Sequence, residues 1–152
     1  DEALCRIIEP HVCTTQKRYE ALVKLHEAGI PTVVWFNPIL PFINDTEENI
    51  AGILDLCRKA NVGGVINFGM GLTLREGNRE YFYQQLDRHF PGLKEQYIRT
   101  WGDAYELISP NARHLEALFR AECDKYGIWR NNDRIFHYLS EFEEKTEQIS
   151  LF

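Results

Sequence analysis

Cysteine, methionine and long apolar runs are all scarce in this chain of 152 residues, and each scarcity excludes a class of protein. Its four cysteines form no CxxC pair, so neither a zinc site of paired cysteines nor a disulfide scaffold is expected. No apolar run approaches the roughly 18 residues that a membrane span requires. Sparse, unpaired thiols favour a cytoplasmic protein.

Positive charge is also scarce, because 17 lysines and arginines stand against 23 aspartates and glutamates, and the net charge is −6. An acidic domain binds nucleic acid poorly without sequence preference, since phosphate contacts need an excess of basic side chains. Any role on nucleic acid must therefore use a local arginine cluster or a part of the protein outside these residues.

Common phosphate and metal motifs are absent as well. There is no GxxxxGK[ST] loop and no HExxH pair, and the five histidines are scattered along the chain. The stretch Gly69-Met70-Gly71 begins like a dinucleotide fingerprint, but Leu74 stands at its third glycine position. The sequence therefore predicts no metal site and no Rossmann site.

What the sequence does contain is an alternation of helical and strand patterns up to residue 69. The continuous apolar runs 32–36 and 63–68 predict strands buried on both faces, each preceded by a helix. Such alternation favours right-handed crossovers and a parallel sheet in an α/β fold. Because two strands cannot bury two apolar faces, and residue 1 is aspartate, we expect the C-terminal half of a larger unit.

Capping residues indicate where the helices begin. Thr14 or Thr15 can cap the first periodic helix, which Gly29 ends, and Asp45 with Glu48 forms the capping box of the second. Four further helices are predicted: residues 78–90, residues 93–101, a helix from the Ser109 cap to Gly127, and residues 135–142.

Two segments beyond the predicted strand ends are candidate sites. Arg75 and Arg79 are four residues apart, so they could share a helix face and bind one substrate phosphate or cofactor carboxylate. The alternative is a solvated helix start with mixed charges. The loop from Pro38 to Asp45 is either a ligand-facing wall or a rigid turn from strand to helix.

A set of short motifs occurs in order over about residues 1–100. They are Glu9-Pro10, Arg18, Glu27-Ala28-Gly29-Ile30-Pro31, Pro38-Ile39-Leu40-Pro41 and Asn44-Asp45. Together they resemble the C-terminal half of radical S-adenosylmethionine proteins, and within these the spore photoproduct lyase and DNA repair photolyase-like group.

The resemblance implies a fold and a set of cofactors. Members of this group fold as a partial (β/α)6 TIM-like barrel, bind a [4Fe–4S] cluster and S-adenosylmethionine, and generate a 5′-deoxyadenosyl radical. It implies that residues 1–77 are the C-terminal part of such a barrel, that residues 78–146 are a helical extension, and that residues 147–152 are a tail. The cofactor-binding residues that it implies are Pro38, Ile39, Pro41, Gly69, Met70 and Gly71.

The cluster motif of that group, CxxxCxxC, is missing. Three thiolates of this motif hold the cluster and leave one iron open for the cofactor. In the family the motif follows the first strand, which would lie upstream of Asp1. We therefore expect the 152-residue chain to bind no cluster and to be inactive, whereas the parent protein is expected to be an iron–sulfur lyase that acts on DNA in lesion reversal. RNA or a peptide remains open as the substrate.

The last five residues, Gln148-Ile149-Ser150-Leu151-Phe152, resemble the peptide that binds the bacterial sliding clamp. In such peptides Leu and Phe fill an apolar pocket and Gln fixes the register. This implies partner contacts by Gln148, Ile149, Leu151 and Phe152. The alternative is a tail that packs Leu151 and Phe152 on its own domain.

Two hypotheses of different classes follow. In the first, the parent is a radical S-adenosylmethionine enzyme acting on nucleic acid. In the second, the helical region from Asn78 onward is an adaptor without chemistry, recruited to DNA by the clamp. For either, a half barrel leaves a parallel strand edge and an apolar inner face bare, which predicts self-association or a helix folding over them.

Overall fold

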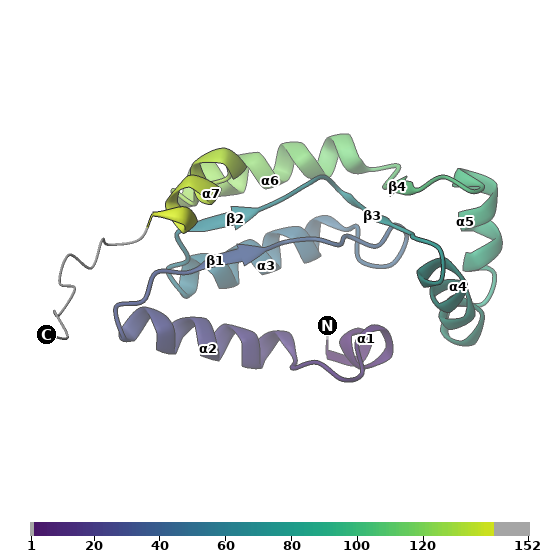
Figure 1. Ribbon diagram of the computed structural model, residues 1–152, viewed down its shortest axis with the longest axis horizontal. Helices are drawn as coiled ribbons and strands as arrows, with labels where there is room; N and C mark the ends of the chain where they lie inside the picture. Colours follow the sequence, from purple (N-terminus) through teal and green to yellow (C-terminus); the bar gives the residue numbers. More distant parts are fainter. Residues whose placement is uncertain (1, 142–152) are drawn as a thin grey trace, which may run out of the picture.

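The protein is a mixed α/β fold, and a computed structural model describes residues 2–141 (Figure 1). Its elements in chain order are α1 (Glu2–Ile8), α2 (Thr15–Glu27), β1 (Val33–Trp35), α3 (Glu47–Lys59), β2 (Gly64–Ile66), β3 (Gly71–Thr73), α4 (Asn78–His89), α5 (Leu93–Trp101), β4 (Glu106–Ile108), α6 (Ala112–Tyr126) and α7 (Asn132–Ser140). The described strands form one parallel pair and one antiparallel pair and do not close into a barrel.

A parallel strand pair lies at the centre of the larger part of the molecule. Val33 pairs with Gly64 and Trp35 with Ile66, so the predicted parallel arrangement is confirmed. On the other side of β2, Trp129 makes a parallel bridge to Gly64. Three neighbouring segments therefore run in one direction, and α3 and α6 are the crossovers between them.

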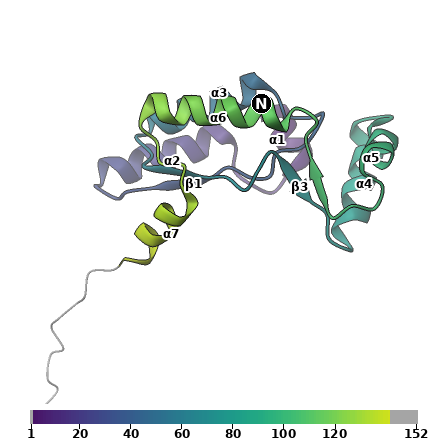
Figure 2. The same cartoon turned by 90° about the horizontal axis from the view of Figure 1, so that it is seen from above.

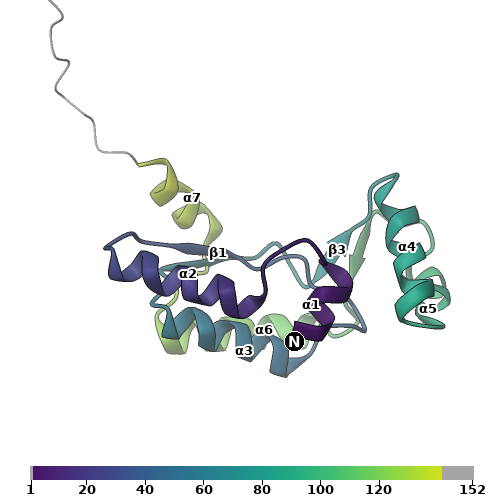
Figure 3. The same cartoon turned by 90° about the horizontal axis from the view of Figure 1, so that it is seen from below.

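Helices α2, α3 and α6 lie on one side of these strands (Figure 3). Helices α3 and α6 pack along each other, and α2 contacts α3. The apolar stripes that predicted these helices supply the core between them, which includes Ile50, Leu54, Val65, Leu115 and Phe119, all with 2% exposure or less. Burying each such side chain contributes about 1.5–3 kcal/mol.

Helix α7 lies on the opposite side of the strands from α3 and α6 (Figure 2). Ile135 of α7 is fully buried, and a Cβ on Gly64 would come within 3.0 Å of its side chain. Glycine at position 64 therefore lets α7 approach β2 closely. On β1, Trp35 remains 59% exposed, and no strand among residues 2–141 pairs with the outer edge of β1. Self-association through that edge remains a prediction.

Residues 71–108 form a separate unit, inserted between β2 and α6. Strands β3 and β4 pair antiparallel and connect the parallel layer to α4 and α5, which pack together at the far end of the molecule (Figure 1). This inserted unit has its own core, made of Leu74, Leu86, Tyr97 and Leu107. The chain beyond residue 77 is thus more than a helical extension, since it contains β4 and since α6 belongs to the layer of α3.

Asp45 and Ser109 were predicted as N-caps, but neither occupies the N-cap position of its helix, and the two side chains are hydrogen-bonded to each other. The Ser109 hydroxyl also accepts a hydrogen bond from the Asn111 N–H at 3.0 Å. Thr46 caps α3, where its side chain accepts a hydrogen bond from the Asn49 N–H, and the N-cap of α6 is Asn111. Asp45 is buried and accepts a 2.5 Å hydrogen bond from the Ser109 hydroxyl. This bond attaches the loop after β1 to the segment that enters α6, across 64 residues of sequence.

None of the helices within residues 2–141 is long and apolar enough to cross a membrane.

Candidate functional site at the rim of the parallel strands

Two loops meet where β1 and β2 end. The side-chain N–H of Asn37 donates to the Gly69 carbonyl at 2.6 Å, and its side-chain oxygen accepts from the Phe68 N–H at 2.8 Å. Two residues further along each loop, the Ile39 N–H donates to the Gly71 carbonyl at 3.0 Å. Ligands bind at the carboxyl ends of parallel strands in α/β folds. The rim formed by these two loops, residues 37–41 and 67–71, is therefore the candidate site.

The residues expected to bind a cofactor occupy this rim in two different ways. Pro38 is exposed and Gly69 is half-buried with open space above it. By contrast, Ile39 and Met70 are 1% exposed and belong to the core, and Pro41 is fully buried. A bound molecule could therefore touch Pro38 and Gly69 directly, while the buried residues fix the shape of the two loops.

Gly71 is half-buried and is part of strand β3. A Cβ at this position would collide with the Leu107 carbonyl oxygen and lie 3.0 Å from the Ile108 Cα. Only glycine permits this approach of β4. Gly71 therefore fixes the inserted unit to the rim, whatever else it contacts.

An asparagine network at the rim was not predicted from the sequence. The Asn67 side chain donates to the Glu116 carboxylate at 3.0 Å and accepts from the Gly69 N–H at 2.9 Å. Asn132 donates to the Asn67 carbonyl at 2.8 Å. The only signal in the sequence was that an asparagine follows each of the three parallel segments, as Asn37, Asn67 and Asn131-Asn132 do.

Three aromatic side chains at the rim were also missed. Trp35, Phe68 and Phe136 come from β1, from the loop after β2 and from α7, and their ring centroids lie 5.2 to 6.5 Å apart. Sequence patterns assigned Trp35 and Phe68 to strands buried on both faces. In the structure Trp35 is 59% exposed and Phe68 61% exposed.

Arg75 and Arg79 lie in the same turn, but each side chain is hydrogen-bonded to other residues of the chain. Arg75 Nε donates to the Tyr105 hydroxyl at 3.3 Å, and this hydrogen bond raises the pKa of Arg75 and lowers the pKa of Tyr105. Arg79 donates to four backbone carbonyls, those of Leu74, Gly102, Asp103 and Ala104. Both side chains hold the turn before β4, and the shared anion site remains a prediction.

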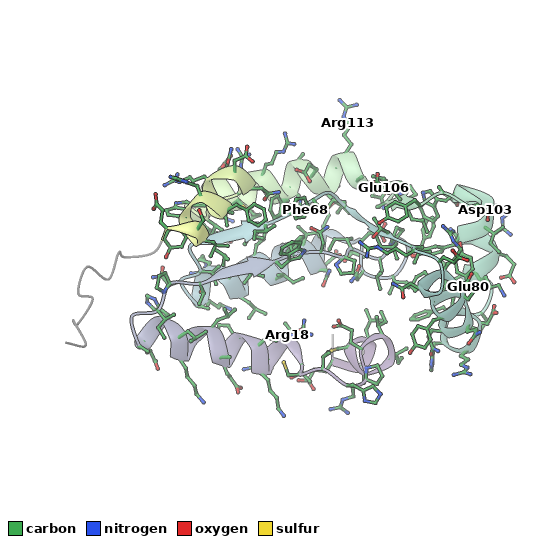
Figure 4. All side chains as sticks on the ribbon, in the orientation of Figure 1. Arg18, Phe68, Glu80, Asp103, Glu106 and Arg113 are labelled. Atoms are coloured by element: carbon green, nitrogen blue, oxygen red, sulfur yellow. The ribbon has the colours of Figure 1, made fainter. Side chains whose placement is uncertain are left out.

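A cavity of about 300 Å³ lies between α1, α2, β1 and α3, behind the rim. Its wall includes Pro38 and Ile39 as well as Arg18, which Figure 4 labels on α2. Arg18 donates to the Glu9 carboxylate at 3.2 Å, and its pKa is raised by hydrogen bonds to the Cys13 and Glu9 side chains. The cavity is otherwise mainly apolar, so it offers one ion pair and no cluster of metal ligands.

The described residues do not fit an iron–sulfur cluster. Within residues 2–141 no three His, Cys, Asp or Glu side chains gather in a way that could hold a metal ion. Cys57 and Cys123 are buried in the core, and burial raises their pKa to about 11 and about 12. Such thiols stay protonated at neutral pH, whereas iron binds thiolates.

The clamp-like residues Gln148, Ile149, Leu151 and Phe152 lie outside the described residues.

Comparison with known proteins gives a distant, partial match. An uncharacterized protein of Mycobacterium tuberculosis and one of Mycobacterium bovis are each 32% identical to the chain over 97 residues. The match covers 64% of this chain and 28% of each relative, so the chain spans little more than a quarter of the relatives that it matches. No family model matches the chain, and no solved structure matches it with significance.

Proposed function

We propose that this chain is part of a radical S-adenosylmethionine enzyme of the spore photoproduct lyase and DNA repair photolyase-like group, which acts on nucleic acid. Its parallel segments would be the last strands of a partial (β/α)6 barrel. The observation that supports the proposal is that the two segments implied to bind the cofactor, residues 38–41 and 69–71, lie together at the carboxyl ends of parallel strands. Hydrogen bonds from Asn37 to Gly69 and from Ile39 to Gly71 connect them.

The chain's own residues would position the cofactor. Gly69 has a φ of +112°, which side chains rarely tolerate, and the space above it is open. A ligand could therefore approach the backbone there, and exposed Pro38 would form an apolar wall beside it. S-adenosylmethionine, when bound with the cluster, supplies the radical chemistry.

The iron–sulfur cluster would be held elsewhere in the protein, since the described residues do not fit it. The length of the mycobacterial relatives supports this division, because most of each relative lies outside the match. No step of the reaction is therefore assigned to the four cysteines of this chain.

Anaerobic reconstitution with iron and sulfide tests the proposal. The full-length gene product should develop the absorption band of a [4Fe–4S] cluster, and the chain of residues 1–152 should not. Replacing the cysteines of a CxxxCxxC motif in the longer protein is the matched control and should abolish the band. A band on residues 1–152 alone, or none on the longer protein, would contradict the proposal.

A second candidate function is a non-catalytic adaptor. It is favoured by the inserted unit, which has a core of its own, and by the clamp-like tail. A pulldown with purified sliding clamp tests it: the clamp should retain residues 1–152 and should release a chain that ends at Thr146. Equal retention or equal loss of both would count against the tail as the recruiting element.

A further inference from the structure

Two asparagine side chains take the place of neighbouring strands just beyond the end of β2, where Figure 4 labels Phe68. The regular backbone pairing of β1 with β2 ends with the bond from the Phe36 N–H to the Ile66 carbonyl, at 2.9 Å. Beyond it, the Asn37 side chain accepts from the Phe68 N–H at 2.8 Å and donates to the Gly69 carbonyl at 2.6 Å. An asparagine side chain carries the N–H and the C=O of a peptide group, so it can pair with a strand as a peptide group does.

Asn132 repeats this arrangement on the other side of the same segment. Its side-chain N–H donates to the Asn67 carbonyl at 2.8 Å, and its side-chain oxygen accepts from the Asn67 N–H at 3.4 Å. The Asn67 side chain in turn accepts from the Gly69 N–H at 2.9 Å. Residues 67–69 are therefore held from both sides by side-chain amides instead of by strands.

Gly69 has no backbone polar group left for a bound molecule. Its N–H is bound to Asn67, and its carbonyl accepts from Asn37 and, at 3.2 Å, from the Gly71 N–H. The open space at Gly69 therefore faces a carbon atom, and a molecule there would make van der Waals contact. A gap of about 0.5–1 Å already forfeits a quarter to a half of such an attraction. The position of Gly69 thus determines how well that molecule binds.

The bonds of Asn37 fix Gly69 relative to β1. The other hydrogen bonds of Gly69 come from its own loop, so they shape the turn without attaching it to another strand. Asn37 directly precedes Pro38, the exposed apolar wall of the proposed cofactor site. The bond from Ile39 to Gly71 attaches the two loops further from the strands. One side chain therefore sets the distance between the two surfaces, Pro38 and Gly69, that a bound molecule would touch.

We propose that Asn37 is a positioning residue of the rim, which holds Pro38 and Gly69 at the separation that a bound molecule requires. This inference rests on the proposed function, because S-adenosylmethionine is the molecule expected beside these two residues. Asn37 is half-buried, and its side-chain nitrogen and oxygen are both bonded to the loop after β2. It therefore acts through Gly69 and not by touching the cofactor.

Equilibrium dialysis of labelled S-adenosylmethionine against the anaerobically reconstituted full-length gene product tests the proposal. Asn37→Ala removes both hydrogen bonds. Asn37→Asp keeps the acceptor for the Phe68 N–H but turns an oxygen toward the Gly69 carbonyl. Both variants should weaken binding about tenfold or more, because the rim is no longer preorganised. Asn61→Asp is the matched control, since it adds the same charge at an exposed position before β2, and its affinity should not change.

Amide hydrogen exchange of the 152-residue chain gives a second readout that needs neither cluster nor cofactor. The Phe68 amide should exchange about tenfold faster or more in Asn37→Ala, which lacks its acceptor, and at the parent rate in Asn61→Asp. Thermal unfolding of each variant separates positioning from a structural role. A structural role would lower the melting temperature and leave the affinity of the folded protein unchanged.

Unchanged affinity of Asn37→Asp, or a variant that loses only melting temperature, would overturn the proposal. Unchanged exchange of the Phe68 amide in Asn37→Ala would also overturn it, since the bond would then hold nothing. The two proposals fail in different ways. A parent protein that binds no S-adenosylmethionine contradicts the proposed function and the role of Asn37 with it. A parent and Asn37 variants that bind equally well contradict the positioning role alone.

Discussion

Two tyrosines of the inserted unit differ in what their hydroxyl groups contact. The Tyr97 hydroxyl is fully buried and donates to the Pro41 carbonyl at 2.6 Å, and burial raises the pKa of Tyr97. The Tyr83 hydroxyl is also buried, but it has no hydrogen-bond partner among the described residues. The same chemical change should therefore have different effects at the two positions.

Tyr97→Phe should lower the free energy of unfolding by about 1–3 kcal/mol, because it leaves the Pro41 carbonyl without its donor. Tyr83→Phe should change it by no more than about 0.5 kcal/mol, or should stabilise the protein, because no bond is lost. Urea unfolding of both variants measures the difference. Equal destabilisation of the two would show that the contact to Pro41 does not hold the rim loop.

Replacing Gly71 or Gly52 by alanine should change the stability of the protein in opposite directions. Gly71→Ala should destabilise the protein by about 1–3 kcal/mol or more, because the new methyl group collides with the β4 backbone. Gly52→Ala, in helix α3 with open space around it, should stabilise by about 0.5–1 kcal/mol through helix propensity. Thermal unfolding followed by circular dichroism measures the change in melting temperature of both variants. A stabilising Gly71→Ala would contradict the close approach of β4 to Gly71.

At the scale of elements, the buried bond between Asp45 and Ser109 connects the loop after β1 to the start of α6. Ser109→Ala should lower the free energy of unfolding by about 1.5–3 kcal/mol, since it leaves a buried carboxylate oxygen unpaired. Asp45→Asn should also destabilise. The double variant should lose less than the sum of the two, and a double-mutant cycle from urea unfolding measures this coupling. Additive losses would show that the two side chains do not interact.

The sequence was sufficient to predict the elements that have strong periodicity. Thr14 caps α2 and Gly29 ends it with a φ of +73°, as predicted, and the two apolar runs form the parallel pair. The strands β3 and β4 were missed because each has three residues and no alternating pattern. Asp45 was taken as a cap because its distant partner Ser109 cannot be read from local sequence.

The candidate site was predictable only in part, for a related reason. The parallel order of β1 and β2 sufficed to place residues 38–41 and 69–71 at one rim. Which of these side chains are buried depends on α3 and α6, because Ile39 and Met70 share one core with residues of these two helices. For that reason Met70 and Ile39 lie in the core, while Phe68, part of a run predicted to be buried, is exposed.

At the scale of the whole molecule, stability should fall in alkaline solution because of the buried thiols Cys57 and Cys123. Their folded pKa values are about 11 and about 12, whereas an unfolded thiol titrates near about 8.5. Above about pH 8.5 the unfolded chain therefore loses protons that the folded chain keeps. The stabilisation is complete below that pH and is lost as the pH rises toward 11 and 12, by about 1.4 kcal/mol per pH unit for each thiol.

Urea unfolding from pH 8 to pH 10.5 measures how the free energy of unfolding depends on pH, and a variant with both cysteines replaced by alanine is the control. The variant will be less stable at pH 8, but its stability should fall less steeply with pH than that of the parent chain. Other groups titrate in both proteins, so only the difference between the slopes reports the thiols. Parallel slopes would show that the two thiols are not buried as described.

We propose above that the rim of β1 and β2 belongs to a radical S-adenosylmethionine enzyme. Its most direct test is the reductive cleavage of S-adenosylmethionine by the reconstituted full-length gene product, with 5′-deoxyadenosine quantified by chromatography. 5′-Deoxyadenosine should form, and Gly69→Val, which places a branched side chain in the open space at the rim, should reduce its formation at least tenfold with the cluster band unchanged. A cluster-loaded protein that forms no 5′-deoxyadenosine, or full activity of Gly69→Val, would contradict it.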